Sequence, residues 1–566
     1  MLGLCTVAVA EAQVQLGQDG KGGVLAGSFE TNSIYYVDDS TLGLEPDADL
    51  REYIGSNSYL KLDYTLDRFS AGVQGDLFLP ALQGYEVGDS RYDKNGKREL
   101  QYYLSSIYAQ WQDQNYGIRL GSIFDQFGNG LIFRSFEDRQ LGLNNSLLGL
   151  HARYSLGRYF TVKAMAGVPR LYMFGDDTAS WFQRQYAESL IGGADLSLSL
   201  SDMIGAERLN LSLEGSYVIR HEALDKNYNG VDGVAIFGVK NFKEENLHMY
   251  SARVNMDYEG FSLRGEYVHK SSDLSSQVAQ KPQTGYAALL ELGYNYKSFS
   301  ISGQARVLDN MGTVLSLYGT GTGNTLNYLP ALTRQYTYML ANLEPYRVNP
   351  EGEIGGQVDV YYSYRSKINR RRYWNFHANF STFYTLDDTS NPTGSRELLW
   401  RDLNFDVERQ WSKSWKTTLL YSYQEWNPFH GAQHRTYVAN VFVADVTYKI
   451  NRKHSLRAEA QYLLTNEYQG DWVAGLLEYS FAPSWSFYFQ GMYNLDQYPA
   501  HDKPLDSVTK EPLKVFYYNG GFSYTHGRTR VQLSYGRNRA GYICSGGVCR
   551  YTPAYTGVNL ALTTSF

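Results

Sequence analysis

Few residues of this 566-residue chain stand at the spacings that catalysis requires. The 10 histidines are scattered, and His430 and His434, which share one predicted loop, have no acidic partner at a useful spacing. His-Glu-x-x-His, Gly-x-Ser-x-Gly and Gly-x-x-x-x-Gly-Lys-Ser/Thr motifs are absent. The run from Gly319 to Gly323 follows no strand-to-helix junction, so we interpret it as a flexible loop rather than a nucleotide site. We predict a protein that is not an enzyme and holds no cofactor.

Two cysteines near the C-terminus could form a covalent link. Cys544 and Cys549 enclose the sequence Ser-Gly-Gly-Val, so a disulfide would close a loop tip. By the loop-entropy model such a ring adds roughly 2 kcal/mol. The alternative, half of a metal site, lacks a second pair of ligands nearby. We therefore predict a disulfide and no metal.

Charged and aromatic residues gather in residues 121–149, a stretch without regular alternation. The charged side chains there include Arg134, Glu137, Asp138 and Arg139, which stand near phenylalanines. Such side chains could hold a solute or narrow a passage. What they do depends on the elements that surround them.

The last dozen residues predict the type of these elements. Alternate positions form an apolar face ending in an aromatic residue, namely Val558, Leu560, Leu562, Thr564 and Phe566. The strand resembles the C-terminal strand of bacterial outer-membrane β-barrels, in which a final Phe is the usual recognition signal for the barrel insertase. The resemblance implies that Leu560, Leu562 and Phe566 act as an insertion signal.

The same alternation recurs along the whole chain. Leu403, Phe405 and Val407, for example, alternate with Asp402, Asn404 and Asp406, and 15% of all residues are aromatic. Charges directly beside apolar positions fit a sheet between lipid and water better than a doubly covered core. There is no apolar run of 18 residues that would predict a membrane-spanning helix. We therefore predict an all-β, closed, antiparallel transmembrane barrel.

The turns fall into two classes that broadly alternate. Short turns include Asp67-Arg68 and Lys297-Ser298, whereas long loops include residues 80–98 and 311–353. This asymmetry is typical of outer-membrane barrels, with short turns in the periplasm and long loops outside. The segments number about 24, within a range of about 22 to 26, and an even count places both termini in the periplasm. A soluble sandwich or propeller is the main competitor, but no fixed-period repeat supports a propeller.

The N-terminus is predicted to be the remnant of a secretory signal peptide. Residues 1–12 are small and mostly apolar and end in Ala10-Glu11-Ala12, which fits an A-x-A cleavage site. Residues 13–566 would then form the barrel, with the segment around 125–146 folded inward. We expect its aromatic residues on the barrel wall and Arg134, Glu137, Asp138 and Arg139 against lumenal charges. It would be a stiffening plug or, alternatively, a constriction or ligand platform.

Two stretches carry a more specific resemblance. Residues 121–149 and 541–553, the second reading Gly-Tyr-Ile-Cys-Ser-Gly-Gly-Val-Cys-Arg-Tyr-Thr-Pro, resemble an uncharacterised family of large porin-like outer-membrane barrels of Bacteroidota. The resemblance implies the barrel and a Gram-negative envelope but no substrate. Since some large barrels of that phylum are partners of assembly or secretion machines, it also leaves open an auxiliary role beside surface lipoproteins.

A non-catalytic outer-membrane barrel could have one of three functions. It could be a pore, or a structural subunit of an envelope complex, for which the apolar residues Leu329, Tyr336, Tyr338 and Met339 would serve docking. A plugged, energy-coupled transporter is disfavoured, because only about ten residues separate Ala12 from the first strand. The expected partners are the lipid bilayer, the barrel insertase and surface lipoproteins or other barrels. A net charge of −6 provides no basic surface for nucleic acid.

Overall fold

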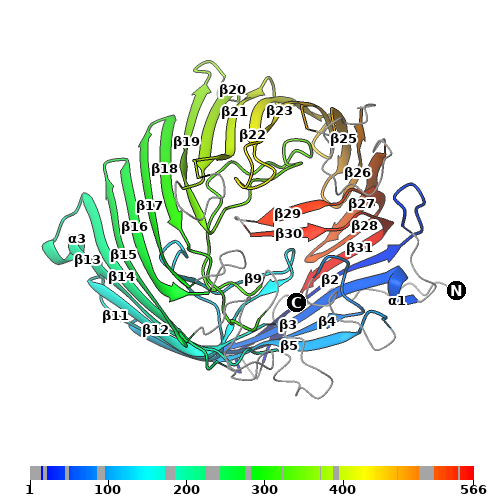
Figure 1. The fold of residues 1–566 in the computed structure, drawn as a ribbon. Coiled ribbons are helices and arrows are strands. Elements are labelled where there is room, and N and C mark those ends of the chain that lie inside the picture. Colours follow the sequence, from blue (N-terminus) through cyan, green and yellow to red (C-terminus); the bar gives the residue numbers. More distant parts are fainter. Residues whose placement is uncertain are drawn as a thin grey trace.

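The computed structural model describes residues 14–16, 22–44, 50–85, 96–171, 185–224, 243–274, 282–319, 323–369, 371–386, 394–467, 469–495, 515–545 and 548–566. The predicted signal remnant, residues 1–12, lies outside the described residues. The main sheet contains 25 strands, of which the two-residue β1 (Val14–Gln15) is attached only to β2 and the other 24 form a ring. Figure 1 shows this ring, with the last strand beside the first.

The wall strands follow one another around the ring in chain order. They are β2 (Val24–Tyr36), β3 (Ile54–Leu66), β4 (Phe69–Phe78), β5 (Gln101–Gln112), β6 (Tyr116–Ile123), β11 (Leu147–Leu156), β12 (Phe160–Pro169), β13 (Leu190–Ser199), β14 (Leu209–His221), β15 (Asn246–Tyr258), β16 (Phe261–Asp273), β17 (Gln283–Tyr296), β18 (Phe299–Asp309), β19 (Gly352–Arg365), β20 (Tyr373–Tyr384), β21 (Leu398–Gln410), β22 (Trp415–Trp426), β23 (Tyr437–Lys449), β24 (His454–Thr465), β25 (Trp472–Phe481), β26 (Trp485–Asn494), β27 (Phe516–His526), β28 (Thr529–Asn538) and β31 (Tyr555–Ser565).

Short elements stand apart from the wall. They are the strands β7 (Gln126–Phe127), β8 (Phe133–Arg134), β9 (Glu137–Asp138), β10 (Leu143–Asn144), β29 (Gly541–Ser545) and β30 (Val548–Thr552), and the helices α1 (Leu50–Tyr53) and α3 (Leu200–Ile204). No helix within the described ranges has the length and apolarity needed to cross a membrane.

The ring closes where β31 pairs antiparallel with β2. The register runs from Ser28 opposite Ser565 to Tyr36 opposite Gly557, and the other edge of β31 pairs with β28. A closed ring satisfies every strand edge, which a bilayer requires because it offers no water to unpaired backbone groups. The predicted single closed antiparallel barrel of about 24 strands is confirmed.

The two faces of the wall have opposite character. In β21, Leu403 and Phe405 are each 47% exposed, whereas Asp402 and Asn404, which alternate with them, are fully buried. The apolar side chains therefore face outward and the polar ones inward, the reverse of a soluble barrel. This arrangement matches a wall with lipid outside and a polar interior.

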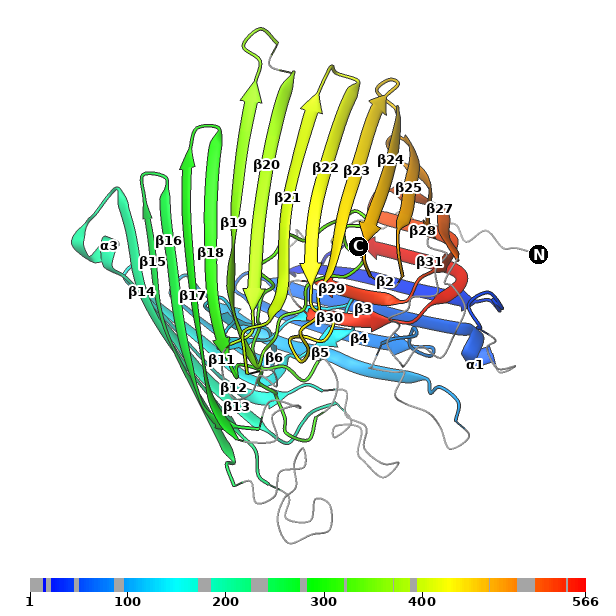
Figure 2. The same cartoon turned by 45° about the horizontal axis from the view of Figure 1, so that its top comes forward.

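The two ends of the barrel differ in the length of their connections. At one end the turns are short, and residues with positive φ such as Asp67 (51°), Glu259 (45°) and Lys297 (52°) make the tight reversals. The C-terminus and the start of β2 lie at this end, because Thr564 pairs with Thr529 and Val24 pairs with Thr65. The chain leaves β18 and β22 at the other end in longer connections, as Figure 2 shows.

Candidate functional site in the barrel lumen

Three chain segments leave the wall and enter the lumen. The first is residues 124–146 with β7 to β10, the second is residues 310–319 and 323–351 between β18 and β19, and the third is the β29–β30 hairpin (Figure 1). In Figure 1, β9 and the β29–β30 hairpin lie inside the ring of wall strands, and the green trace after β18 runs beside them. We call them the first, second and third lumenal segments.

Aromatic packing fixes the first lumenal segment. Phe127 and Phe133, partners in the β7–β8 pair, have ring centroids 5.4 Å apart and are fully buried. They belong to one apolar cluster with wall residues such as Val218, Met249 and Val268. Glu266 of β16 accepts a hydrogen bond from the Asn129 backbone N–H at 3.0 Å, which fixes the turn between β7 and β8.

The four predicted lumenal charges have different partners. Arg139 donates to Glu30 Oε2 of β2 at 2.8 Å and to Gln74 Oε1 of β4 at 3.1 Å. Glu137 accepts a hydrogen bond from Gln74 Nε2 at 2.6 Å. Two of the four thus contact the wall.

Arg134 and Asp138 make contacts within the lumen instead. The Arg134 guanidinium lies over the rings of Phe136 and Tyr328, 4.2 and 4.0 Å from their centroids. Asp138 Oδ1 accepts a hydrogen bond from the Leu141 N–H at 3.0 Å and so fixes a turn. Arg134 therefore connects the first lumenal segment to the second.

The first and second lumenal segments are hydrogen-bonded to each other. The Arg134 N–H donates to the Leu326 carbonyl at 3.0 Å, and the Tyr328 N–H donates to the Gly130 carbonyl at 2.8 Å. The buried Asn327 side chain donates to the carbonyls of Leu131 at 3.1 Å and Met311 at 2.8 Å. The two segments form one packed unit.

The second lumenal segment is bonded to widely separated parts of the wall. Arg220 of β14 donates to the Val314 carbonyl at 2.7 Å. Further along, the Leu340 N–H donates to Gln461 Oε1 of β24 at 2.9 Å, and Gln424 of β22 donates to the Ala341 carbonyl at 2.8 Å. The segment therefore extends inside the barrel from β14 to β24.

This position corrects one expectation from the sequence. Leu329, Tyr336 and Tyr338 were expected on an outer loop that docks partners. Instead, Leu329 packs against the apolar cluster of Phe127 and Phe133, and Tyr336 and Tyr338 pack against a second apolar cluster on β22 to β24. The physical reason is that β21 to β24 offer inward apolar residues such as Leu420, Val441 and Leu463, which a long loop can cover only from inside.

The third lumenal segment carries the cysteine pair. Cys544 and Cys549 are disulfide-bonded, with a Cα–Cα distance of 4.1 Å, and face each other in the β29–β30 hairpin. Arg550 of the hairpin lies 3.9 Å from the ring centroid of Tyr85, and Arg347 of the second segment lies 4.4 Å from that of Tyr542. The hairpin thus contacts the second lumenal segment.

A cavity of about 530 Å³ lies between the first lumenal segment and the wall strands β3 to β6. Its lining includes Lys61, Arg119 and Arg134 as well as Asp125 and Glu137. Asp125 is held by Lys163 at 2.8 Å and His151 at 3.0 Å. This mixed lining favours neither sign of solute charge.

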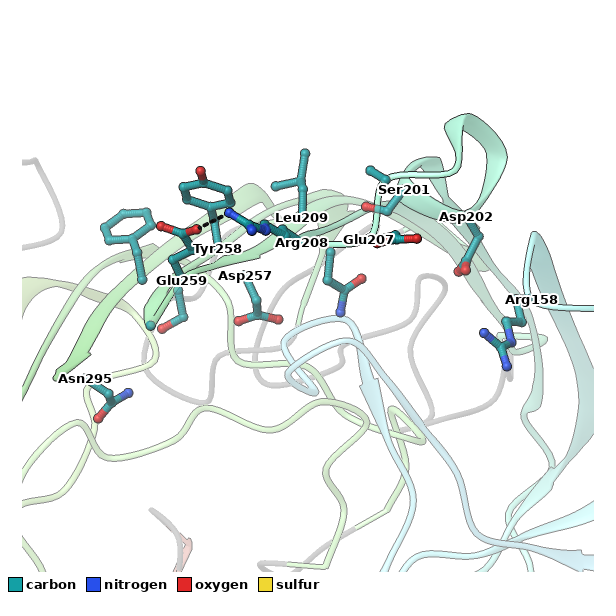
Figure 3. Close-up of a pocket in the computed structure, with 15 residues that line it drawn as sticks. Arg158, Ser201, Asp202, Glu207, Arg208, Leu209, Asp257, Tyr258, Glu259 and Asn295 are labelled. Carbon is teal, nitrogen blue, oxygen red and sulfur yellow. Dashed lines mark hydrogen bonds and ion pairs between the residues drawn. The ribbon is translucent and has the colours of Figure 1, made fainter. Parts of the chain in front are cut away.

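A second cavity of about 530 Å³ opens at the short-turn end. Figure 3 shows its polar side chains, with Arg208 and Glu259 joined by an ion pair of 3.3 Å across neighbouring turns. Both side chains are largely exposed, so this is a hydrated surface of the short-turn end rather than an enclosed site.

The fold gives one of the two loop histidines an acidic partner that is distant in sequence. His434 Nδ1 lies 2.7 Å from Glu397 Oε2, which precedes β21 and is 37 residues away in sequence. The neighbouring Ser395 hydroxyl donates to Glu397 Oε1 at 3.0 Å. Within the described part of the chain, no group of three or more His, Cys, Asp or Glu residues could hold a metal ion.

Sequence comparison gives the family of the chain. A family model described as a family of unknown function, DUF6029, matches residues 1–566. The chain belongs to this family. No curated protein matches the chain in sequence.

Solved structures similar to this member of DUF6029 include three large barrels. The P pilus usher (PapC) translocation pore aligns with a TM-score of 0.43 and 10% identity over 96% of this chain and 99% of the usher chain. A mutant of the ferric enterobactin receptor PfeA from Pseudomonas aeruginosa aligns with a TM-score of 0.44 and 9% identity, covering 96% and 80% of the two chains. The siderophore receptor PirA from Pseudomonas aeruginosa aligns with a TM-score of 0.42 and 8% identity, again over 96% and 80%.

Proposed function

We propose that this chain is a non-catalytic integral outer-membrane barrel whose own lumenal segments close it to free diffusion. In this role it is a structural subunit of an envelope complex rather than a wide pore. One observation carries the proposal: the second lumenal segment is bonded to the wall at β14 and at β22 and β24, and to the first segment between them.

The lumenal contacts matter because a ring of this size would be open without them. Barrels of 16 to 18 strands already leave an aqueous channel, so an empty ring of 24 strands would leave a wider one. Packed loops with buried hydrogen bonds do not move aside without exposing apolar side chains and leaving polar groups unpaired. The closed state is therefore the stable one.

A selective pore is the second candidate. The cavity beside the first lumenal segment, with Lys61 and Arg119 on the wall and Asp125 opposite, favours it. A narrow solute path along these charges would leave the packing of the second segment intact.

Co-purification tests the subunit role. The full chain, tagged in a long loop and expressed at its native level, is extracted from membranes in mild detergent beside an equally tagged unrelated outer-membrane barrel. We expect a partner, such as a surface lipoprotein or another barrel, in near-stoichiometric amount with this chain alone. Recovery of only the single barrel, together with solute-selective uptake by proteoliposomes, would favour the selective pore.

A further inference from the structure

A separate cavity lies at the long-loop end, where the second lumenal segment meets β21 to β25. Its volume is about 260 Å³. It is lined by residues 344–347 of that segment, by the ends of β21, β22 and β23, and by Glu467 and Gln469 between β24 and β25. Pockets for drug-sized ligands span about 300–1,000 Å³, so this one fits a fragment no larger than a single ring.

Aromatic side chains form one side of this rim cavity. Trp400 pairs with Trp426 across β21 and β22, and Trp426 pairs with Tyr437 across β22 and β23. The ring centroids of Tyr346 and Trp400 are 5.8 Å apart, and those of Trp426 and Tyr437 are 5.9 Å apart. Phe429 completes this lining.

The aromatic rings are held in place by contacts behind them. Tyr346 stacks on Phe383, with centroids 5.0 Å apart, and its hydroxyl donates to Glu353 at 2.5 Å. The loop that carries Phe429 is fixed by Asn427, whose side chain accepts the Phe429 N–H at 2.9 Å. The cavity is therefore shaped before any ligand arrives.

Two polar groups in the lining have no hydrogen-bonding side-chain partner. Glu467 is only 9% exposed, and its carboxylate accepts no hydrogen bond from the residues the structure describes. Arg347 stacks on Tyr542 at 4.4 Å but forms no ion pair within the same described ranges. Glu344, by contrast, is paired with Arg539 at 3.6 Å. A largely buried carboxyl group that lines the cavity without a protein donor is available to hydrogen-bond with a ligand.

Glu467 offers an acceptor, Arg347 offers donors, and the aromatic rings form one side of the cavity. Together these groups limit the chemistry of the ligand. A cation would meet the repulsion of Arg347, and an anion that of Glu344 and Glu467. A neutral ring with several hydroxyl groups meets neither, because its hydroxyls both donate and accept hydrogen bonds and its C–H faces pack against aromatic rings.

We propose that the rim cavity binds one sugar ring of a glycan, with Glu467 accepting and Arg347 donating hydrogen bonds to its hydroxyls. Burial, together with the charge of Glu344, raises the pKa of Glu467 from 4.5 to about 7, which agrees with a carboxylate that lacks a donor. The proposal does not depend on whether the lumen conducts, because the cavity opens at the rim.

Binding is measured on the detergent-solubilised full chain by saturation-transfer NMR with the methyl glycosides of glucose, galactose and mannose. Tetramethylammonium serves as the cationic probe. The expected result is saturable binding of at least one glycoside. At pH 8, where Glu467 is mostly ionised, Glu467→Gln should weaken it by about tenfold, because a charge-assisted hydrogen bond becomes a neutral one. Glu259→Gln, at the short-turn end, is the matched control and should bind as the wild type does.

Two further arms complete the experiment. Trp426→Leu removes part of the aromatic side of the cavity and should also weaken glycoside binding. If Trp426→Leu folds poorly, the result for Glu467→Gln still decides the proposal. Competition by lipopolysaccharide in nanodiscs would assign the sugar to the membrane's own glycolipid, whereas lack of competition would assign it to a soluble glycan. Absence of saturable glycoside binding, tighter binding of tetramethylammonium, or an unchanged affinity in Glu467→Gln would overturn the proposal.

Discussion

Gly27 and Phe566 exchange two backbone hydrogen bonds across the seam of the barrel. The Gly27 N–H donates to the Phe566 carbonyl at 2.7 Å, and the Phe566 N–H donates to the Gly27 carbonyl at 2.9 Å. The Phe566 ring lies over Gly27 so closely that a Cβ atom there would be 2.3 Å from it. The last residue of the chain therefore helps to close the ring, and any side chain at position 27 would have to displace the Phe566 ring.

Gly27→Val should destabilise the seam. The added side chain must displace the Phe566 ring, and overpacking of this kind costs about 1–3 kcal/mol. We expect a lower temperature for the loss of the heat-modifiable folded band on gels. Gly215→Val is the control, because a Cβ atom there would lie 3.6 Å from its nearest neighbour, an ordinary contact. Equal stability of the two variants would contradict the packing described for Phe566.

Asn327→Ala should loosen the lumenal segments and leave the wall intact. It removes two hydrogen bonds and leaves the carbonyls of Leu131 and Met311 without this donor, which costs about 1–3 kcal/mol. Hydrogen exchange should rise in residues 126–134 and 311–328 but not in the wall strands. Asn342→Ala, at an exposed position of the same segment, should leave exchange unchanged. Faster exchange throughout the wall would show that the segments are not a separate unit.

The disulfide should stabilise the hairpin alone. Cys544 and Cys549 lie in β29 and β30, which pair with each other and with no wall strand. Replacing both cysteines by serine should increase protease cleavage between residues 541 and 552 while the heat-modifiable band keeps its transition temperature. A fall in that temperature would mean that the hairpin supports the wall.

Stability near the rim should depend on pH through Glu467. Its pKa of about 7 lies above the ordinary value of 4.5, so the folded state binds more protons than the unfolded state between these values. Stability must therefore fall as pH rises through this window. Glu467→Gln should flatten the change in transition temperature between pH 5 and pH 8. An equally steep change in the variant would assign the titration to another group.

The alternation of side chains made the barrel predictable, because lipid and water impose opposite preferences on successive residues. Leu403, Phe405, Asp402 and Asn404 show this pattern in sequence and occupy the expected faces. Residues 311–319 and 323–351 lack the pattern, so their place inside the barrel could not be derived from it. The apolar residues that they cover, such as Val441 and Leu463, are distant in sequence.

Long-range pairing also concealed the rim cavity and the partner of His434. Three separate parts of the chain line this cavity and contribute Arg347, Trp400 and Glu467. No regular spacing in the sequence predicts that these residues lie together. Likewise, Glu397 reaches His434 only because β21, β22 and β23 are neighbours. The inward position of residues 125–146 was easier to anticipate, since Phe127 and Phe133 interrupt the alternation where a wall strand should continue.

Conductance of the purified full chain in planar lipid bilayers shows whether the lumen is closed. We expect a membrane-inserted barrel with little or no steady conductance. Replacing residues 126–145 by a short Gly-Ser linker should then produce large open steps, because the second segment loses its hydrogen-bonded partner. Large, stable steps from the unaltered chain would contradict a lumen closed by its own segments.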